Sequence, residues 1–227
     1  MTKITENLQL VRQRIRAAAA AAGRDPGEIR LLAVSKTHSS SAIAEASDAG
    51  QEHFGENYVK EALEKMERLD GRKLRWHFIG RLQANKTGPI ARNFHWLHSL
   101  TRVDIARRLS DQRPHGTRPL QVCIQVRIGD EESKAGVSDQ ALPELAAAVA
   151  ELPGLNLRGL MCLPPYTTDE SIQRTNFATL RRCLEHLRSE GHDLDTLSMG
   201  MSADLESAVM EGSTCVRIGT AIFGPRG

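Results

Sequence analysis

Eight short apolar segments recur along this chain of 227 residues, and each is followed by polar residues and a helical pattern. The segments are 31–35, 53–55, 76–80, 96–100, 120–126, 157–163, 196–200 and 215–219. Strands that alternate with helices predict parallel β/α units. Eight units in a chain near the usual ~250 residues predict a closed (β/α)8 barrel. The alternative is a doubly wound open sheet, but the glycine-rich first turn of that fold is missing after Ser35.

Helical patterns lie between these segments. Apolar residues at steps of four, three and four near the start predict an extra N-terminal helix: Ile4, Leu8, Val11 and Ile15. A second helical stripe consists of Ile172, Leu180, Cys183, Leu184 and Leu187. A third helix is predicted from Ser202 to Glu211, with Gly212 after its end. We expect residues 1–227 to form one barrel domain, with 1–29 as the N-terminal helix and lead-in.

Charge and composition argue against several classes of partner. The 30 basic and 28 acidic residues leave a net charge of +2 and are interspersed, so no basic stripe for nucleic acid is indicated. No apolar run approaches the ~18 residues of a membrane span, and the charged N-terminus is unlike a signal peptide. The four cysteines are too widely spaced for a CxxC pair, which favours buried free thiols in a reducing cytoplasm over zinc or disulfides. We therefore expect a cytoplasmic protein.

Polar residues gather where the predicted strands end. They are Lys36, Glu56, Asn57, Gln83, Asn85, Lys86, Ser202, Arg217, Gly219 and Thr220. In (β/α)8 barrels the loops after the strands build the open face, and chemistry gathers there. Lys36 alone could equally be a solvated residue beyond its strand.

Lys36 and Arg217 are predicted to face the same mouth. Side chains alternate along a strand, so Lys36 shares a face with Leu32, and Arg217 shares one with Cys215. The first and eighth strands become neighbours when a barrel closes. Two like charges in one mouth favour a neutral amine, which can attack an aldehyde to form a Schiff base.

The loops after the seventh and eighth segments predict a phosphate cradle. These loops are the usual phosphate position in such barrels, and Ser202 is expected to open a helix whose amides favour an anion. By itself Ser202 is more simply an ordinary N-cap. A lysine, an arginine and a phosphate cradle together indicate pyridoxal 5′-phosphate (PLP). The alternatives are a cofactor-free Schiff-base aldolase that uses Lys36 and a barrel with a purely structural role.

Seven stretches in order add a resemblance from about Leu31 to the C-terminus. They are AVSKT, FGENYVKEA, WHFIGRLQANK, ESKAG, LRGLMCLPP, SMGMSADLESAV and GSTCVRIGTAIFG. Together they resemble the PLP homeostasis protein family (YggS/PROSC-type). The barrel of that family is similar to the N-terminal domain of alanine racemase.

The resemblance implies a role for each site residue. Lys36 would form the internal aldimine with PLP. The phosphate would be held by Ser202, Gly219 and Thr220, with the backbone near Met201 contributing.

The resemblance places Arg217 near the pyridine nitrogen and implies that Asn57 is a further pocket contact. A cation there keeps the nitrogen unprotonated, which suits carrying PLP better than carbanion chemistry. Lys134 matches a family lysine that would contribute to PLP transfer or a second binding mode. His38 departs from the lysine or glutamine of many relatives.

We therefore expect a non-catalytic, monomeric PLP-binding protein that buffers PLP or delivers it to PLP-dependent apo-enzymes, without a metal, nucleic acid or membrane. The alternative is a PLP-dependent amino-acid enzyme such as a racemase. A two-base racemase needs a second acid/base, commonly a tyrosine from another domain. We expect no second domain, and the only tyrosines are Tyr58 and Tyr166.

Overall fold

Eight parallel strands close into a barrel in the computed structural model, which describes residues 2–129 and 135–225. The strands are β1 (Arg30–Val34), β2 (His53–Glu56), β3 (Arg75–Phe78), β4 (Trp96–Leu100), β5 (Leu120–Gln125), β6 (Leu155–Met161), β7 (Thr196–Ser198) and β8 (Cys215–Ile218). Each strand pairs with the next in chain order, and β8 returns to pair with β1. The predicted barrel is confirmed and the open-sheet alternative is excluded. The strand ends lie within two residues of the predicted segments.

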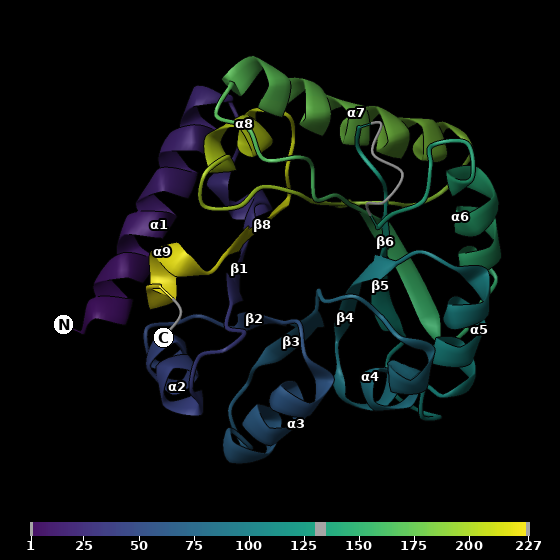
Figure 1. The fold of residues 1–227 in the computed structure, drawn as a ribbon, viewed down its shortest axis with the longest axis horizontal. Helices are drawn as coiled ribbons and strands as arrows, with labels where there is room; N and C mark the ends of the chain where they lie inside the picture. Colours follow the sequence, from purple (N-terminus) through teal and green to yellow (C-terminus); the bar gives the residue numbers. More distant parts are fainter. Residues whose placement is uncertain (1, 130–134, 226–227) are drawn as a thin grey trace.

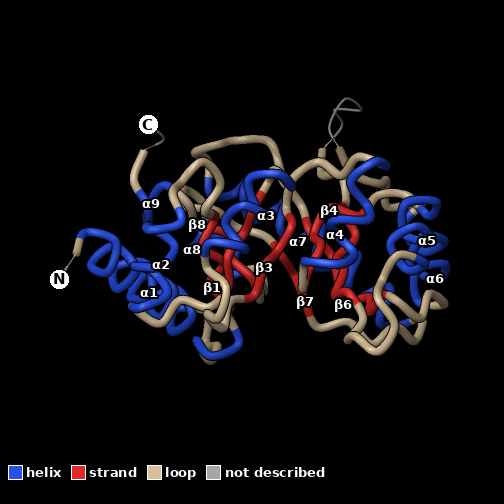
Figure 2. The backbone as a smooth tube through the Cα atoms, turned by 90° about the horizontal axis from the view of Figure 1, so that it is seen from below, coloured by secondary structure: helices blue, strands red, loops and turns tan. Residues whose placement is uncertain are grey.

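The helices lie outside the ring of strands (Figures 1 and 2). They are α1 (Lys3–Ala21), α2 (Ser40–Asp48), α3 (Val59–Arg68), α4 (Thr87–Asn93), α5 (Val103–Asp111), α6 (Leu142–Ala150), α7 (Glu170–Ser189), α8 (Leu205–Met210) and α9 (Thr220–Phe223), with 3-10 turns η1 (Pro26–Glu28) and η2 (Ala84–Lys86). No helix within the described part of the chain is long and apolar enough to cross a membrane.

The two faces of the strands contribute side chains to different apolar clusters. Leu31 and Ala33 of β1 belong to the large apolar layer between strands and helices. Trp96, Cys123 and Met161 form a separate small cluster on the inward faces of β4, β5 and β6. This alternation is what allows side chains at the strand ends to converge at the mouth of the barrel.

The predicted N-terminal helix is present and braces the last β/α units. Leu8, Val11 and Ile15 of α1 are buried, and the helix contacts α8 and α9, beside which it lies in Figure 1. The side-chain amide of Asn7 donates a hydrogen bond of 2.8 Å to the carbonyl of Ile222 in α9. A segment at one end of the chain therefore supports elements at the other end.

The predicted helix from Ser202 to Glu211 was wrong at its start. Residues 202–204 form a turn, and α8 begins only at Leu205. The Asp204 carboxylate accepts a hydrogen bond of 2.6 Å from the Met201 N–H. This contact closes the turn ahead of the helix, so Ser202 does not open it. In α7, Ile172 is exposed, and Phe177 is buried in the predicted stripe instead.

The cysteines are free thiols packed into the fold. Cys123, Cys162 and Cys215 are buried as predicted, and Cys183 is half-buried. Burial raises the pKa of the Cys162 thiol to about 12. Such a thiol stays protonated and inert at neutral pH.

Candidate functional site

A pocket of about 310 Å³ opens at the carboxyl ends of the strands. All seven residues predicted from the sequence line it: Lys36, Asn57, Met201, Ser202, Arg217, Gly219 and Thr220. Val34, Ile79, Met161, Leu163 and Ala203 complete its wall. Its size and its mixture of apolar wall and few polar groups are typical of a small-molecule site.

Strand pairing brings Lys36 and Arg217 together as predicted. β1 lies beside β8, and Leu32 of β1 is the register partner of Arg217. Lys36 follows the end of β1 on the same face as Leu32, and both charged residues line the pocket. The barrel closure therefore places a primary amine and a guanidinium in one mouth.

The chain makes a sharp turn immediately after Lys36. Thr37 has a φ of 67°, which is the left-handed region and is costly for a β-branched residue. Its N–H donates a hydrogen bond of 2.6 Å to the Glu61 carboxylate of α3. The N–H of His38 donates back to the carbonyl of Ser35 at 3.1 Å. These contacts hold a strained backbone conformation next to the lysine.

A second lysine lies behind this turn and was missed in the sequence. The buried Lys65 ammonium donates to the carbonyl of Ser35 at 2.8 Å and to the Glu56 carboxylate at 2.7 Å. It also pairs with Glu61 at 2.5 Å. Burial raises the pKa of Glu56, although Lys65 opposes the shift. The residues on both sides of Lys36 are thus tied to one buried ion-pair network.

The helical spacing of α3 contained a signal for this network. Lys65 recurs at steps of three with Val59 and Ala62, which are buried. A lysine on the buried face of a helix needs a carboxylate partner. Glu61 lies four residues before it, but Glu56 is brought near only by β2.

Arg217 is buried and held by neutral acceptors. Its guanidinium donates to the carbonyl of Cys162 at 2.8 Å and to the hydroxyl of Ser198 at 2.8 Å. It also donates to the carbonyl of Ser198. None of its hydrogen bonds within residues 2–129 and 135–225 goes to a carboxylate. Burial lowers the pKa of Arg217, but an arginine stays charged.

The acidic residues near Ser202 are already engaged. Glu206 pairs with Arg14 of α1 at 2.9 Å, and Arg14 also donates to the carbonyl of Ser202 at 3.1 Å. Asp204 accepts from the Met201 N–H, and burial raises the pKa of its carboxyl. Both effects reduce the repulsion that an anion would meet beside Ser202.

Asn57 contributes a hydrogen-bond acceptor to the pocket. Its side-chain amide oxygen is buried and receives no hydrogen bond from the residues that the structure describes. A Cβ at Gly80 would lie 2.2 Å from the Asn57 carbonyl oxygen, so only glycine lets this backbone pass so closely. Because Asn57 also lines the pocket, this side-chain acceptor is open to a hydrogen bond from a bound molecule. The pocket thus offers an amine, a guanidinium, hydroxyls and an unfilled acceptor.

Other predicted strand-end residues lie elsewhere. Gln83 lines a separate hollow with Ser99 and Arg102, and Asn85 and Lys86 do not line the candidate pocket.

His38 does not line the candidate pocket. The His38 ring stacks on Phe223 of α9, with 5.0 Å between ring centroids. Lys134 lies outside the described residues.

Comparisons with known proteins agree on one family. Residues 4–227 match the family described as "Alanine racemase, N-terminal domain". The "Pyridoxal phosphate homeostasis protein" of Pseudomonas aeruginosa is 54% identical over 226 residues, which cover 100% of this chain and 97% of that protein. The protein of the same name from Escherichia coli is 52% identical over 229 residues, covering 100% and 98%. The solved structure of PipY from Synechococcus elongatus with PLP bound is 35% identical in sequence and has a TM-score of 0.85. The match covers 97% of this chain and 100% of the PipY chain.

Proposed function

This chain belongs to the pyridoxal phosphate homeostasis protein family, and we propose that it binds PLP through Lys36 in the pocket at the mouth of the barrel. It holds the cofactor reversibly, buffers its concentration and delivers it to PLP-dependent apo-enzymes. The chain acts as a carrier and not as an enzyme.

One observation supports this proposal above the others. The amine of Lys36, the guanidinium of Arg217 and the hydroxyl-bearing residues Ser202 and Thr220 line the same pocket of about 310 Å³. PLP, when bound, supplies an aldehyde that combines reversibly with a primary amine. An aldolase without a cofactor needs the lysine but not a buried arginine at the inner end of the pocket.

The polar groups of the pocket have two roles, one toward the phosphate and one toward the pyridine ring. Ser202, Gly219 and Thr220, with the backbone near Met201, bind the phosphate. Arg217 donates to the pyridine nitrogen from the inner end and leaves that nitrogen unprotonated. The guanidinium makes no hydrogen bond to a carboxylate among the described residues, so it remains a strong donor.

Asn57 is a further contact in the lining of the pocket. The buried side-chain oxygen of Asn57, which has no donor among the described residues, is the polar group that it presents to the ligand.

The described lining of the pocket holds no tyrosine to act as a second acid/base, which supports a carrier. Racemisation by two bases needs a proton donor opposite the lysine. Neither tyrosine of the chain lines the pocket. Tyr166 is 81% exposed, and Tyr58 is 57% exposed at the start of α3.

The visible absorption spectrum with and without PLP tests this function. The wild-type protein is expected to turn yellow with PLP, and Lys36→Ala is expected to lose this band. Lys86→Ala, which changes a lysine outside the pocket, is the matched control and should keep it. Assays of amino-acid racemisation on the yellow sample should show no turnover. A protein that stays colourless with PLP would contradict cofactor binding and favour the aldolase alternative, whereas turnover would favour the racemase.

A further inference from the structure

The interior of the barrel contains a continuous chain of polar side chains. His53 Nδ1 lies 2.8 Å from His77 Nε2, and His77 Nδ1 lies 2.9 Å from His98 Nε2. His98 Nδ1 lies 2.8 Å from the hydroxyl of Ser198, which accepts from Arg217 at 2.8 Å. Branched aliphatic residues usually fill this space. A chain of buried polar side chains inside the barrel therefore calls for a structural or functional explanation.

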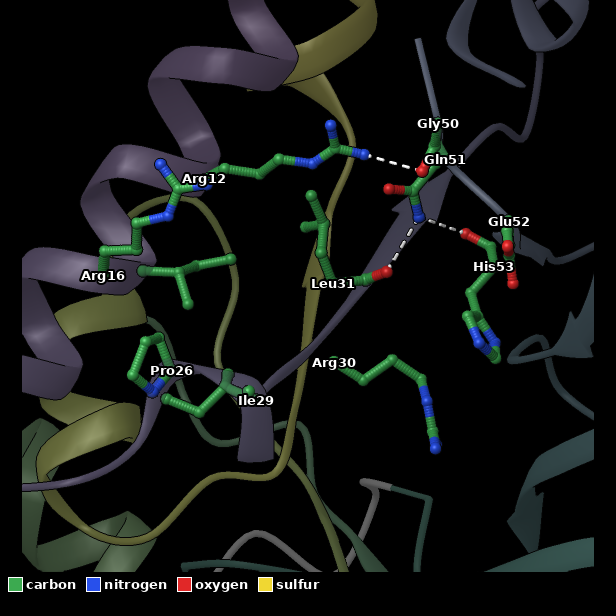
Figure 3. Close-up of a pocket in the computed structure, with 12 residues that line it drawn as sticks. Arg12, Arg16, Pro26, Ile29, Arg30, Leu31, Gly50, Gln51, Glu52 and His53 are labelled. Atoms are coloured by element: carbon green, nitrogen blue, oxygen red, sulfur yellow. Dashed lines mark hydrogen bonds between the residues drawn. The ribbon is translucent and has the colours of Figure 1, made fainter. Parts of the chain in front are cut away.

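The chain of side chains connects the two ends of the barrel. His53 is the first residue of β2 and lies at the amino end of the strands. There it lines a second pocket of about 430 Å³ with Arg30, and Figure 3 shows both side chains on its wall. Arg217 lies at the opposite end, in the candidate PLP pocket.

The three rings are neutral at physiological pH. Burial lowers the pKa of His98 to about 3 and that of His53 to about 4. The pKa of the fully enclosed His77 is also lowered by burial. A neutral imidazole has one N–H donor and one nitrogen lone pair. Each contact between two rings therefore contains a single proton.

This limit couples the tautomers of all three rings. If His77 carries its proton on Nε2, it donates to His53 Nδ1, so His53 must carry its own proton on Nε2. His77 Nδ1 then accepts from His98 Nε2–H. If any ring changes tautomer, the other two must follow. The rings are thus either all Nε2–H or all Nδ1–H.

Arg217 sets the direction of the chain. A guanidinium can only donate, so it occupies a lone pair of the Ser198 oxygen and leaves the hydroxyl hydrogen for another acceptor. The sulfur of Cys215 is also in hydrogen-bond range of that hydroxyl but is a weak acceptor. The hydrogen therefore goes to His98 Nδ1, which selects the Nε2–H form. The negative ends of the three imidazole dipoles then point toward the guanidinium.

We propose that His53, His77 and His98 form a relay that shares one tautomer, Nε2–H, and that this relay, through Ser198, positions Arg217 in the PLP pocket. The positioning role rests on the proposed function of Arg217. The tautomer of the relay does not, because it depends only on the side chains inside the barrel.

Nitrogen NMR of the histidine rings in the protein without PLP tests the relay. In the wild type, all three rings should show a protonated Nε2 and an unprotonated Nδ1. Ser198→Ala removes the link to Arg217 and should shift His53, two rings away, toward a tautomer mixture. His53→Phe removes the last acceptor and should shift His98 toward Nδ1–H. Ser207→Ala, a buried serine that donates to Gln173, should change none of the rings.

PLP titration by absorption tests the positioning role. Ser198→Ala should bind PLP about tenfold more weakly, since a hydrogen bond to a charged group is lost. Ser207→Ala should bind as the wild type does. Different tautomers among the three wild-type rings, or no shift at His53 in Ser198→Ala, would overturn the relay. Coupled tautomers together with an unchanged PLP affinity of Ser198→Ala would overturn the positioning role alone. A wild-type protein that shows no Lys36-dependent absorption band would instead contradict the proposed function and leave the relay unaffected.

Discussion

At the scale of single residues, Lys36 is positioned by a lysine that does not line the pocket. Lys65 binds the carbonyl of Ser35 and the carboxylate of Glu56 in a buried setting. Burying an ammonium and a carboxylate is costly unless they are paired and hydrogen-bonded. The network therefore fixes the backbone on either side of Lys36, and it does so only while both charges are present.

Replacing Lys65 with methionine tests this network. Lys65→Met leaves the Glu56 carboxylate buried without its cation, so we expect the free energy of unfolding to fall by about 3–5 kcal/mol. Urea denaturation measures the change. The double variant Lys65→Met/Glu56→Gln removes the stranded charge and should regain part of the loss. Equal stability of the single and double variants would contradict the argument.

At the scale of elements, the pairing of β6 with β7 depends on one glycine. Gly159 has a φ of 155° and is the register partner of Thr196. A Cβ there would lie 1.9 Å from the Thr196 carbonyl oxygen. β5 and β6 shift register between Val122 and Cys123, next to this position. Two residues beyond Thr196, Ser198 of β7 accepts a hydrogen bond from Arg217.

Gly159→Ala is expected to disturb this pairing. Gly191, with a φ of 96° and open space around its Cα, is the matched control. Both substitutions place a side chain in a strained conformation, but only Gly159→Ala also forces two backbones apart. We expect Gly159→Ala to lower the free energy of unfolding by at least about 2 kcal/mol more than Gly191→Ala. Equal losses of unfolding free energy for the two variants in denaturant titrations would show that the sheet accommodates the added methyl group.

At the scale of the whole molecule, the polar interior makes stability depend on pH. Burial lowers the pKa of His77 and His98 in the folded protein, whereas both titrate near 6.5 when unfolded. Below that value the unfolded chain binds protons that the folded chain does not, so stability falls as the pH falls. His53 and His95 shift in the same direction. Glu56, whose pKa is raised, acts in the opposite direction.

Denaturant titrations at pH 7 and pH 5 measure this effect. Each fully buried ring is expected to contribute a loss of about 2 kcal/mol between these values. His98→Asn removes one titrating ring and should reduce the loss by about 2 kcal/mol, whatever its stability at pH 7. A wild-type protein that is equally stable at both pH values would contradict this account.

Much of the fold could be predicted because strand and helix periodicities are local. The eight apolar segments match the eight strands to within two residues at each end, and the steps from Ile4 to Ile15 identified α1. The start of α8 could not be predicted, because it depends on the Asp204 carboxylate accepting from the Met201 N–H. Propensity alone does not say whether such a residue caps a helix or closes a turn.

The sequence by itself determined the barrel and the residues at its mouth. Side chains alternate along a strand, and the loops after the carboxyl ends of the strands build the open face of a barrel. Strand closure determined that Lys36 and Arg217, 181 positions apart by number (217 − 36), share a pocket. Only the tertiary structure decided which groups support them. Lys65 and the histidine relay depend on contacts between different strands and helices, and buried charges and protons respond to whatever lies within a few ångströms, not to neighbours in sequence.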